Sequence, residues 1–228
     1  MNKFELQLQT KRLILRRPTI QDAQAIFSSY PTQKEDTQSA SALFPPPNSI
    51  QDTLNFIQWS NTQWEKKVGY IFIVCSKADG GRVIGGVGLS LIGLENDIDD
   101  GRLVRDGSEE SKSKLLPAGV ARVGYYITNE QWGKGYATEA VQKMIEFAAA
   151  AAAAGESEMR ITKFVARVHP DNLASIRVLE KCGFQEDKEK VGEMLVALPG
   201  LDKEKARLVG FGRSLSLSDP PPTLTWED

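Results

Sequence analysis

The sequence predicts a single α/β domain, and three observations lead to this fold class. Runs rich in β-branched and aromatic residues, typical of strands, alternate with segments whose apolar residues recur at helical spacing. A turn with two glycines, residues 131–137, joins such a strand to such a helix. The chain has 228 residues, 41% of them apolar, which suits one domain with a substantial core.

The first part of the chain is expected to contribute one strand and one helix, followed by a loop. Residues 13–18 form a strand-like run, and a helix is expected over residues 19–27. Thr19 is a suitable N-cap for that helix, with Asp22 at the capping-box position. Residues 31–49 are polar and then rich in proline, which predicts a surface loop.

A second helix is expected over residues 49–67, where apolar and aromatic side chains recur at helical spacing. Leu54 and Ile57 are expected to face the core. Trp59 and Trp64 fit two interpretations, packing in the core or facing a substrate groove, and the pattern alone leaves both open.

Two β-rich runs follow, residues 69–75 and 82–89, and the Asp79-Gly80 pair between them predicts a hairpin. The glycines within the second run indicate a β-bulge or close packing. Residues 93–118 are densely charged and predict a solvated insertion with the composition of a disordered segment. Its aspartates lack the glycine and glutamate spacing of a calcium loop, so no metal site is expected.

The turn at residues 131–137 follows a predicted strand over 120–127 and precedes a predicted helix that begins near Thr138. Gly133 and Gly135 carry no Cβ, so a bulky ligand can approach the backbone there. The first N–H groups of a helix are unpaired and favour anions such as phosphate or diphosphate. The alternative is a tight turn without a ligand, and the heptapeptide alone supports both.

The last third predicts alternating helices and strands. The helix after the glycine turn continues through the alanines at 148–154 and is expected to stop at Gly155. A strand over 161–168 and a helix ending at the Gly183 cap follow. Two further strand-like runs are expected to pair, and the final residues form a loose tail. These runs are residues 194–198 and 206–211.

Composition excludes several classes of function. A formal charge of −2 and a pI near 5.7 give no electrostatic case for binding nucleic acid. No apolar run is long enough to span a membrane, and the N-terminus lacks the apolar core of a signal peptide. Two cysteines, Cys75 and Cys182, supply neither a disulfide framework nor zinc-ligand spacing. We expect a cytoplasmic protein, with the nucleus as the other option.

Two motifs together resemble the GNAT N-acetyltransferases. Gln131-x-x-Gly133-x-Gly135-x-Ala137 is similar to the acyl-CoA loop of that superfamily, (Q/R)xxGx(G/A). The segment from Asn172 to Phe184 is similar to its helix motif NxxSxxvlEKxGF, with Ser175 at the serine position. Residues 10–16 also resemble the opening strand of the Rim-type branch, which includes ribosomal-protein serine and alanine N-acetyltransferases.

The resemblance implies an α+β (α/β three-layer) fold with a central, mixed, mostly antiparallel sheet that splays at the acyl-CoA site. About seven strands and about four helices are expected. It covers residues 10–212, which we take as one domain containing the 93–118 insertion, and leaves 213–228 as the tail. The implied cosubstrate is acetyl-CoA and the implied partner is an amine acceptor, a protein N-terminus or a small molecule. A monomer or homodimer is expected.

The resemblance also assigns roles to individual residues. The loop N–H groups of 132–137 would hold the CoA diphosphate, and Asn172 would bond the pantetheine arm. The strand end Tyr126 to Thr128 would splay from 161–168 at a bulge and pair with pantetheine. Ser175 would be the general acid for the leaving thiolate. The implied acyl-CoA-binding residues are Tyr126, Ile127, Thr128, Gln131, Trp132, Gly133, Lys134, Gly135, Tyr136, Ala137, Asn172 and Ser175.

The sequence does not identify the general base. Many relatives carry a glutamate two residues before the glycine of the strand, where this chain has Arg122. His169 has a suitable pKa range but lies in a variable lead-in segment. We expect Glu139 to be solvated or supporting and Cys182 to pack, not to react. Arg122 motivates the alternative of an impaired acyl-CoA-binding module, and a nucleotide-binding protein is disfavoured because no complete nucleotide motif is present.

Overall fold

The computed structural model describes residues 6–30, 43–93, 98–99, 102–103, 114–115, 120–153, 161, 163–168, 171–186 and 209–214. Eight strands of these residues form one sheet in the order β1-β2-β3-β4-β9-β10-β12-β11. The neighbouring strands are antiparallel except β9 and β10, which run parallel. The strands are β1 (Gln7–Gln9), β2 (Leu13–Arg16), β3 (Gly69–Ser76), β4 (Arg82–Ser90), β9 (Val120–Ile127), β10 (Lys163–Val168), β11 (Gln185–Glu186) and β12 (Val209–Ser214). The expected mixed, mostly antiparallel sheet is confirmed.

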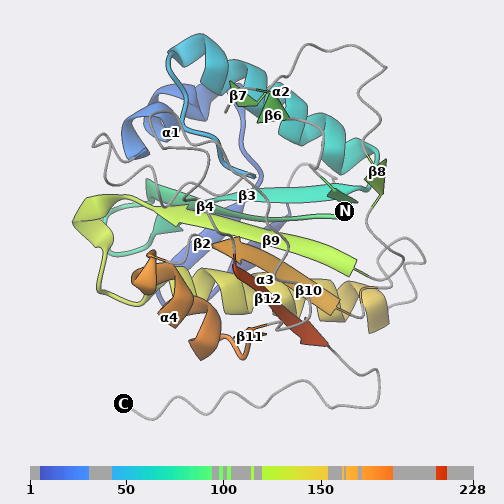
Figure 1. Cartoon of the computed structure of the whole chain (residues 1–228). Coiled ribbons are helices and arrows are strands. Elements are labelled where there is room, and N and C mark those ends of the chain that lie inside the picture. Colours follow the sequence, from blue (N-terminus) through green and yellow to red (C-terminus); the bar gives the residue numbers. More distant parts are fainter. Residues whose placement is uncertain are drawn as a thin grey trace.

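Four α-helices of the described residues cover the two faces of this sheet, which confirms the three-layer prediction. Helices α1 (Ala23–Ser29) and α2 (Ile50–Glu65) pack on one face. Helices α3 (Tyr136–Ala153) and α4 (Leu173–Lys181) pack on the other, as Figure 1 shows. Among the described residues, no helix is long and apolar enough to cross a membrane.

The core divides according to the alternation of side chains along the central strands. In β3, Ile71 and Ile73 pack with α1 and α2, whereas Phe72 and Val74 pack with α3 and α4. All eight residues of β3 are buried, because helices cover both faces of the sheet. This explains why the sequence of β3 is a continuous apolar run.

The hairpin of β3 and β4 is confirmed, and its glycines serve both predicted purposes. The register shifts between Val74 and Cys75 as the two strands pair, which is an irregularity of the bulge type. A Cβ on Gly85 would lie 2.2 Å from the backbone oxygen of Tyr126 in β9. A Cβ on Gly86 would lie 2.5 Å from Phe44. Only glycine therefore allows β4, β9 and the α1–α2 layer to pack this closely.

The two tryptophans of α2 belong to the core. Trp64 makes edge contacts with Tyr70 and Phe72, with ring centroids at 4.9 and 5.0 Å, and its indole N–H donates to the carbonyl of Ile71 at 3.0 Å. Trp59 packs, partly buried, against the cluster beneath α1 and α2. Contacts within the fold thus account for both side chains.

Several predicted boundaries shift. The sheet begins earlier than predicted, because β1 forms a hairpin with β2, and it continues to Ser214 through β12. In and directly before the 93–118 insertion, the described residues form two short antiparallel pairs. These are β5 (Ile92–Gly93) with β8 (Lys114–Leu115) and β6 (Ile98–Asp99) with β7 (Arg102–Leu103). The predicted 194–198 strand, the Gly155 helix stop and most of the 31–49 loop lie outside the described residues.

The predicted capping box at Thr19 is confirmed, and an ion pair reinforces it. The backbone N–H of Thr19 donates to Asp22 Oδ2 at 2.8 Å, and Arg16 donates to both carboxylate oxygens, at 2.6 and 2.8 Å. Burial works to raise the pKa of Asp22, but the hydrogen bonds from Arg16 and Thr19 outweigh it and hold that pKa below its ordinary value. The network ties β2 to the start of α1.

Replacing Asp22 is expected to destabilise the fold in a pH-dependent way. Because its folded-state pKa is depressed, the carboxylate adds stability that is present above about pH 4 and lost as the pH falls further. Asp22→Asn should lower the free energy of unfolding by about 2 kcal/mol at pH 7 in urea denaturation. The difference from the wild type should shrink in acid.

The exposed pair between Arg82 and Glu130 offers a matched control. Glu130→Gln should change the free energy of unfolding by less than about 1 kcal/mol, since both side chains are solvated. Equal effects of the two substitutions would contradict a specific role for the Asp22 network.

Candidate functional site

The candidate site lies where β9 and β10 stop pairing. In the described residues the parallel ladder joins residues 120–122 of β9 to residues 163–165 of β10 and goes no further. Both strands continue, β9 to Ile127 and β10 to Val168. The predicted splay is therefore present. The β-bulge that was predicted to cause this splay is absent from β9. This strand pairs with β4 in an unbroken register from Arg122 to Ile127.

The backbone of Ile127 faces the splayed side of β9. The N–H of the next residue, Thr128, donates to Ile84 in β4 at 2.8 Å. Because successive residues of a strand direct their backbone groups to opposite sides, Ile127 points away from β4. The carbonyl of Ile127 accepts the indole N–H of Trp132 at 2.6 Å, in agreement with that direction. Of the predicted strand-end residues, Ile127 alone turns its backbone to the splay.

The backbones of Tyr126 and Thr128 face β4, so they do not face the splay. The backbone of Tyr126 is in register with Gly86 of β4. Its hydroxyl lies 2.9 Å from Ser29 Oγ on α1, and its ring stacks on Tyr30 with centroids 4.2 Å apart. Desolvation by burial raises the pKa of Tyr126 well above its ordinary value, so the phenol stays neutral. The sequence did not reveal this use of Tyr126.

The glycine turn has the backbone conformation that its residues predict. Gly133 and Gly135 have φ of +72° and +77°, values that L side chains rarely adopt. A Cβ on Gly133 would meet no atom within 4 Å, so that side of the backbone is open to solvent. The turn leads directly into α3, whose first backbone hydrogen bond runs from Glu139 N–H to the Gly135 carbonyl at 3.1 Å.

A series of backbone donors surrounds this turn. Within the part of the chain that the structure describes, the N–H groups of residues 133–138 have no protein acceptor. The N–H of Trp132, predicted to join them, donates instead to Asn129 at 3.1 Å in the 3-10 turn η3 (Asn129–Gln131). Donors on a turn with left-handed glycines, at the positive end of a helix dipole, form an anion site.

Side-chain hydrogen bonds hold the glycine turn at residues 131–137. Gln131 is buried, and its side-chain oxygen accepts Lys134 Nζ at 2.8 Å. The Gln131 amide nitrogen lies 3.4 Å from Asp79 Oδ2 in the β3–β4 turn. Trp132 is an exposed apolar side chain of this loop. Gln131 therefore acts on the shape of the loop through its side chain.

Helix α4 presents the second motif. Asn172 is its N-cap, and its side-chain oxygen accepts the N–H of Ser175 at 3.0 Å. The cap uses Oδ1, so Nδ2 is the end of this side chain that can donate to a ligand. Ser175 is partly buried, and no hydrogen bond from its hydroxyl to the described helix backbone is present.

Tyr125 links the splayed strand to this helix. Its hydroxyl donates to the backbone carbonyl of Ser175 at 3.1 Å. Desolvation by burial raises the pKa of the Tyr125 hydroxyl far above its ordinary value, so it remains a donor at neutral pH. The bond holds the first turn of α4 at a fixed distance from β9.

The remaining candidates have clear positions. Arg122 is 3% exposed and shares the sheet face of Tyr126, toward α1 and α2. Cys182 is buried against α3, which confirms packing. Glu139 is buried rather than solvated, since Arg12 pairs with it at 2.6 Å. His169 lies outside the described residues.

Comparison with known proteins identifies the fold and the family. The model of the acetyltransferase (GNAT) domain family matches residues 12–185. The chain belongs to the GNAT acetyltransferases. It is an acetyltransferase, and acetyl-CoA is its cosubstrate, as the two motifs predicted. The matched range holds β9, the glycine turn and α4, which together form the candidate site.

Individual relatives agree with this placement. The chain is 27% identical over 203 residues to an uncharacterized N-acetyltransferase, p20, of Bacillus licheniformis, covering 89% of this chain and 90% of that protein. A putative ribosomal-protein-serine acetyltransferase of Vibrio cholerae has the same fold, with TM-score 0.62, 20% identity and coverage of 93% and 99%. RimL, a ribosomal L7/L12 α-N-protein acetyltransferase solved with coenzyme A, gives TM-score 0.64, 15% identity and coverage of 93% and 99%.

The residues present suit the cosubstrate. The open side of Gly133 leaves room for a diphosphate, and the N–H groups of residues 133–138, which have no acceptor among the described residues, can donate to it. The edge of β9 beyond Arg122, which β10 leaves unpaired, can pair with the amides of pantetheine as an added strand would. The acetyl thioester that acetyl-CoA supplies is an activated acyl group, which an amine can attack directly.

Gly133→Ala should weaken CoA binding by about 10-fold or more, since the methyl group occupies the side on which the phosphate approaches. Isothermal titration calorimetry with CoA measures this. Gly80→Ala is a matched control, because Gly80 also has positive φ (+63°) and open space at its Cβ position but lies in the β3–β4 turn. Both variants should lose about 1 kcal/mol of stability, and only Gly133→Ala should lose affinity.

Proposed function

We propose that the protein transfers the acetyl group to the α-amine of a protein N-terminus, by direct attack and without a covalent enzyme intermediate. The observation that carries this proposal is the combination at the splay. The backbone of Ile127 faces away from β4, the donors of residues 133–138 lie at the start of α3, and Ser175 lies in the first turn of α4.

Ile127 supplies the group that stabilises negative charge in this proposal. Its N–H lies on the same side of β9 as its carbonyl, which is the splayed side. As the amine attacks the thioester carbon, charge develops on the carbonyl oxygen, and a fixed backbone donor stabilises it without reorganising. The unbroken ladder between β9 and β4 and the bond from Trp132 hold this residue in place.

Ser175 acts as general acid in the proposed reaction. When the carbon–sulfur bond breaks, the hydroxyl of Ser175 donates its proton to the sulfur, and solvent returns a proton to the serine. The Asn172 cap and the Tyr125 bond both act on the backbone of Ser175, at its N–H and its carbonyl, and so fix the origin of the side chain. The hydroxyl itself stays free to turn toward the ligand.

We choose an α-amine as the acceptor because its protonated form has a lower pKa than that of a lysine side chain. Only a neutral amine attacks, and Arg122 stands where the family resemblance implies a glutamate that would accept its proton. For an α-amine with a pKa near 8, deprotonation at pH 7 costs about 1.4 kcal/mol, against almost 5 kcal/mol for a lysine near 10.4. An α-amine therefore reacts with solvent as base. Two of the similar structures bear names that support a protein acceptor: the putative ribosomal-protein-serine acetyltransferase of Vibrio cholerae and RimL, a ribosomal L7/L12 α-N-protein acetyltransferase.

Ser175→Ala should lower kcat by about 100-fold and leave the CoA dissociation constant within about threefold of the wild type. The backbone N–H of residue 175, which donates to the Asn172 cap, remains, so α4 should keep its start. Steady-state kinetics and calorimetry on the same preparations measure both values. Ser28→Ala, on the exposed face of α1, is the control and should change neither. An unchanged kcat in Ser175→Ala would remove the general-acid role.

The acceptor class is tested with two peptides of one sequence. The first has a free N-terminus and no lysine, and the second has a blocked N-terminus and one lysine. Acetylation of the first should dominate at pH 7. Its kcat/KM should rise with pH, reach half of its maximum at about pH 8 and level off above about pH 9, since only the neutral amine reacts. Preferred acetylation of the lysine peptide, or of a panel of small amines over both peptides, would contradict the proposed acceptor.

A further inference from the structure

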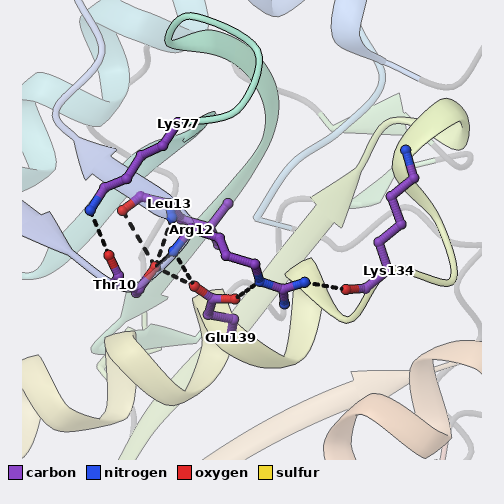
Figure 2. Close-up of polar contacts among 6 residues, drawn as sticks. All are labelled: Thr10, Arg12, Leu13, Lys77, Lys134 and Glu139. Atoms are coloured by element: carbon purple, nitrogen blue, oxygen red, sulfur yellow. Dashed lines mark hydrogen bonds and ion pairs between the residues drawn. The ribbon is translucent and has the colours of Figure 1, made fainter. Parts of the chain in front are cut away.

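A polar network joins the segment before β2 to the start of α3, more than a hundred residues away in the sequence (Figure 2). At its centre is the carboxylate of Glu139, which is 6% exposed. One carboxylate oxygen accepts the hydroxyl of Thr10 and the backbone N–H of Arg12, the latter at 3.0 Å. The other accepts Nε of Arg12 at 2.6 Å. Glu139 is thus fully engaged by the N-terminal segment.

The same arginine also holds the glycine turn. Its second guanidinium nitrogen, Nη1, donates to the backbone carbonyl of Lys134 at 2.8 Å, as Figure 2 shows. Its guanidinium carbon lies 4.6 Å from the centre of the Tyr136 ring, over the first residue of α3. Arg12 therefore spans the junction between the glycine turn and α3.

The bond to Lys134 determines where a neighbouring donor points. A trans peptide is planar, so its carbonyl and the N–H of the next residue point in opposite directions. No cis peptide is present in the described chain. The Lys134 carbonyl points toward Arg12, and the N–H of Gly135 consequently points away from Arg12, to the outer side of the turn. Gly135 is one of the donors that have no protein acceptor.

The ion pair between Arg12 and Glu139 also affects the electrostatics of the anion site. Glu139 lies in the first turn of α3, where an uncompensated carboxylate would repel a diphosphate bound at the helix N-terminus. The guanidinium of Arg12 neutralises it at 2.6 Å. The positive end of the helix dipole and the loop donors then act on the ligand without opposition.

The backbone of Arg12 is itself held on the sheet. Its carbonyl accepts the backbone N–H of Lys77, directly after β3, at 2.9 Å. Lys77 Nζ donates to the Thr10 carbonyl at 2.6 Å, and a turn closes between Thr10 and Leu13 at 3.0 Å. Arg12 thus projects from a fixed backbone, so its position is set before any ligand arrives.

We propose that Arg12 is a positioning residue for acyl-CoA. Through the Lys134 carbonyl it orients the Gly135 N–H toward the diphosphate, and through Glu139 it removes the charge that would oppose the ligand. This inference rests on the proposed function, in which residues 133–138 hold the diphosphate, and adds the residue that presets those donors.

The test compares two acyl donors, acetyl-CoA and S-acetylpantetheine, which lacks the diphosphate. Arg12→Gln should raise the KM for acetyl-CoA and the CoA dissociation constant by about 10-fold. It should change kcat, and kcat/KM with S-acetylpantetheine, by less than about threefold. Arg12→Lys should recover part of the loss, because one ammonium group cannot reach both partners with the geometry of a guanidinium. Equal losses with both donors would overturn the proposal in favour of a general structural role.

A second variant separates positioning from direct contact with phosphate, which the partly exposed guanidinium could also make. Glu139→Gln removes the anchor of Arg12 and frees its charge. Under the proposal, CoA binding weakens, by about threefold or more. Tighter or unchanged binding would overturn it, since direct contact gains from the freed charge. Arg82→Gln, which removes the exposed ion pair with Glu130, is the control and should change CoA binding by less than about twofold.

Gly133→Ala, measured in the same series, distinguishes failure of this inference from failure of the proposed function. If Gly133→Ala weakens CoA binding and Arg12→Gln does not, the loop is the ligand site and Arg12 has no positioning role. If neither variant changes CoA binding, the loop assignment itself is wrong, and the inference about Arg12 falls with it.

Discussion

The site depends on one constraint, the end of pairing between β9 and β10 after Arg122 and Val165. A paired strand would satisfy the backbone of Ile127 and close the sheet. Because β9 stays in unbroken register with β4, its far side keeps a fixed direction while β10 diverges. The sheet thus offers an ordered edge in its interior, with the glycine turn at one end and α4 on the diverging side.

The elements around this edge hold one another by contacts to backbone atoms. Trp132 donates to the carbonyl of Ile127, Tyr125 donates to the carbonyl of Ser175, and Arg12 donates to the carbonyl of Lys134. Each bond fixes the direction of a peptide group at the site. Side chains from three different segments of the chain therefore preset the backbone donors, which is the condition for stabilising charge without reorganisation.

Much of this was predictable from the sequence, because glycines, caps and strand runs act locally. The Gly133 and Gly135 turn, the Thr19 capping box and the β3–β4 hairpin follow from their own residues. What depended on distant partners was missed. Glu139 was expected to be solvated or supporting, and it is buried rather than solvated, since Arg12, directly before β2, pairs with it. The N–H of Trp132 was expected at the ligand, but a 3-10 turn that the pattern does not encode engages it.

The central claim is that the backbone donors of the glycine turn and of Ile127 bind acyl-CoA. Backbone amide NMR of the protein with and without CoA tests it most directly. We expect the largest shifts and the largest gains in exchange protection to fall on residues 133–138 and Ile127, with little change at the β3–β4 turn. Changes concentrated elsewhere in the chain, with these amides unaffected, would contradict it.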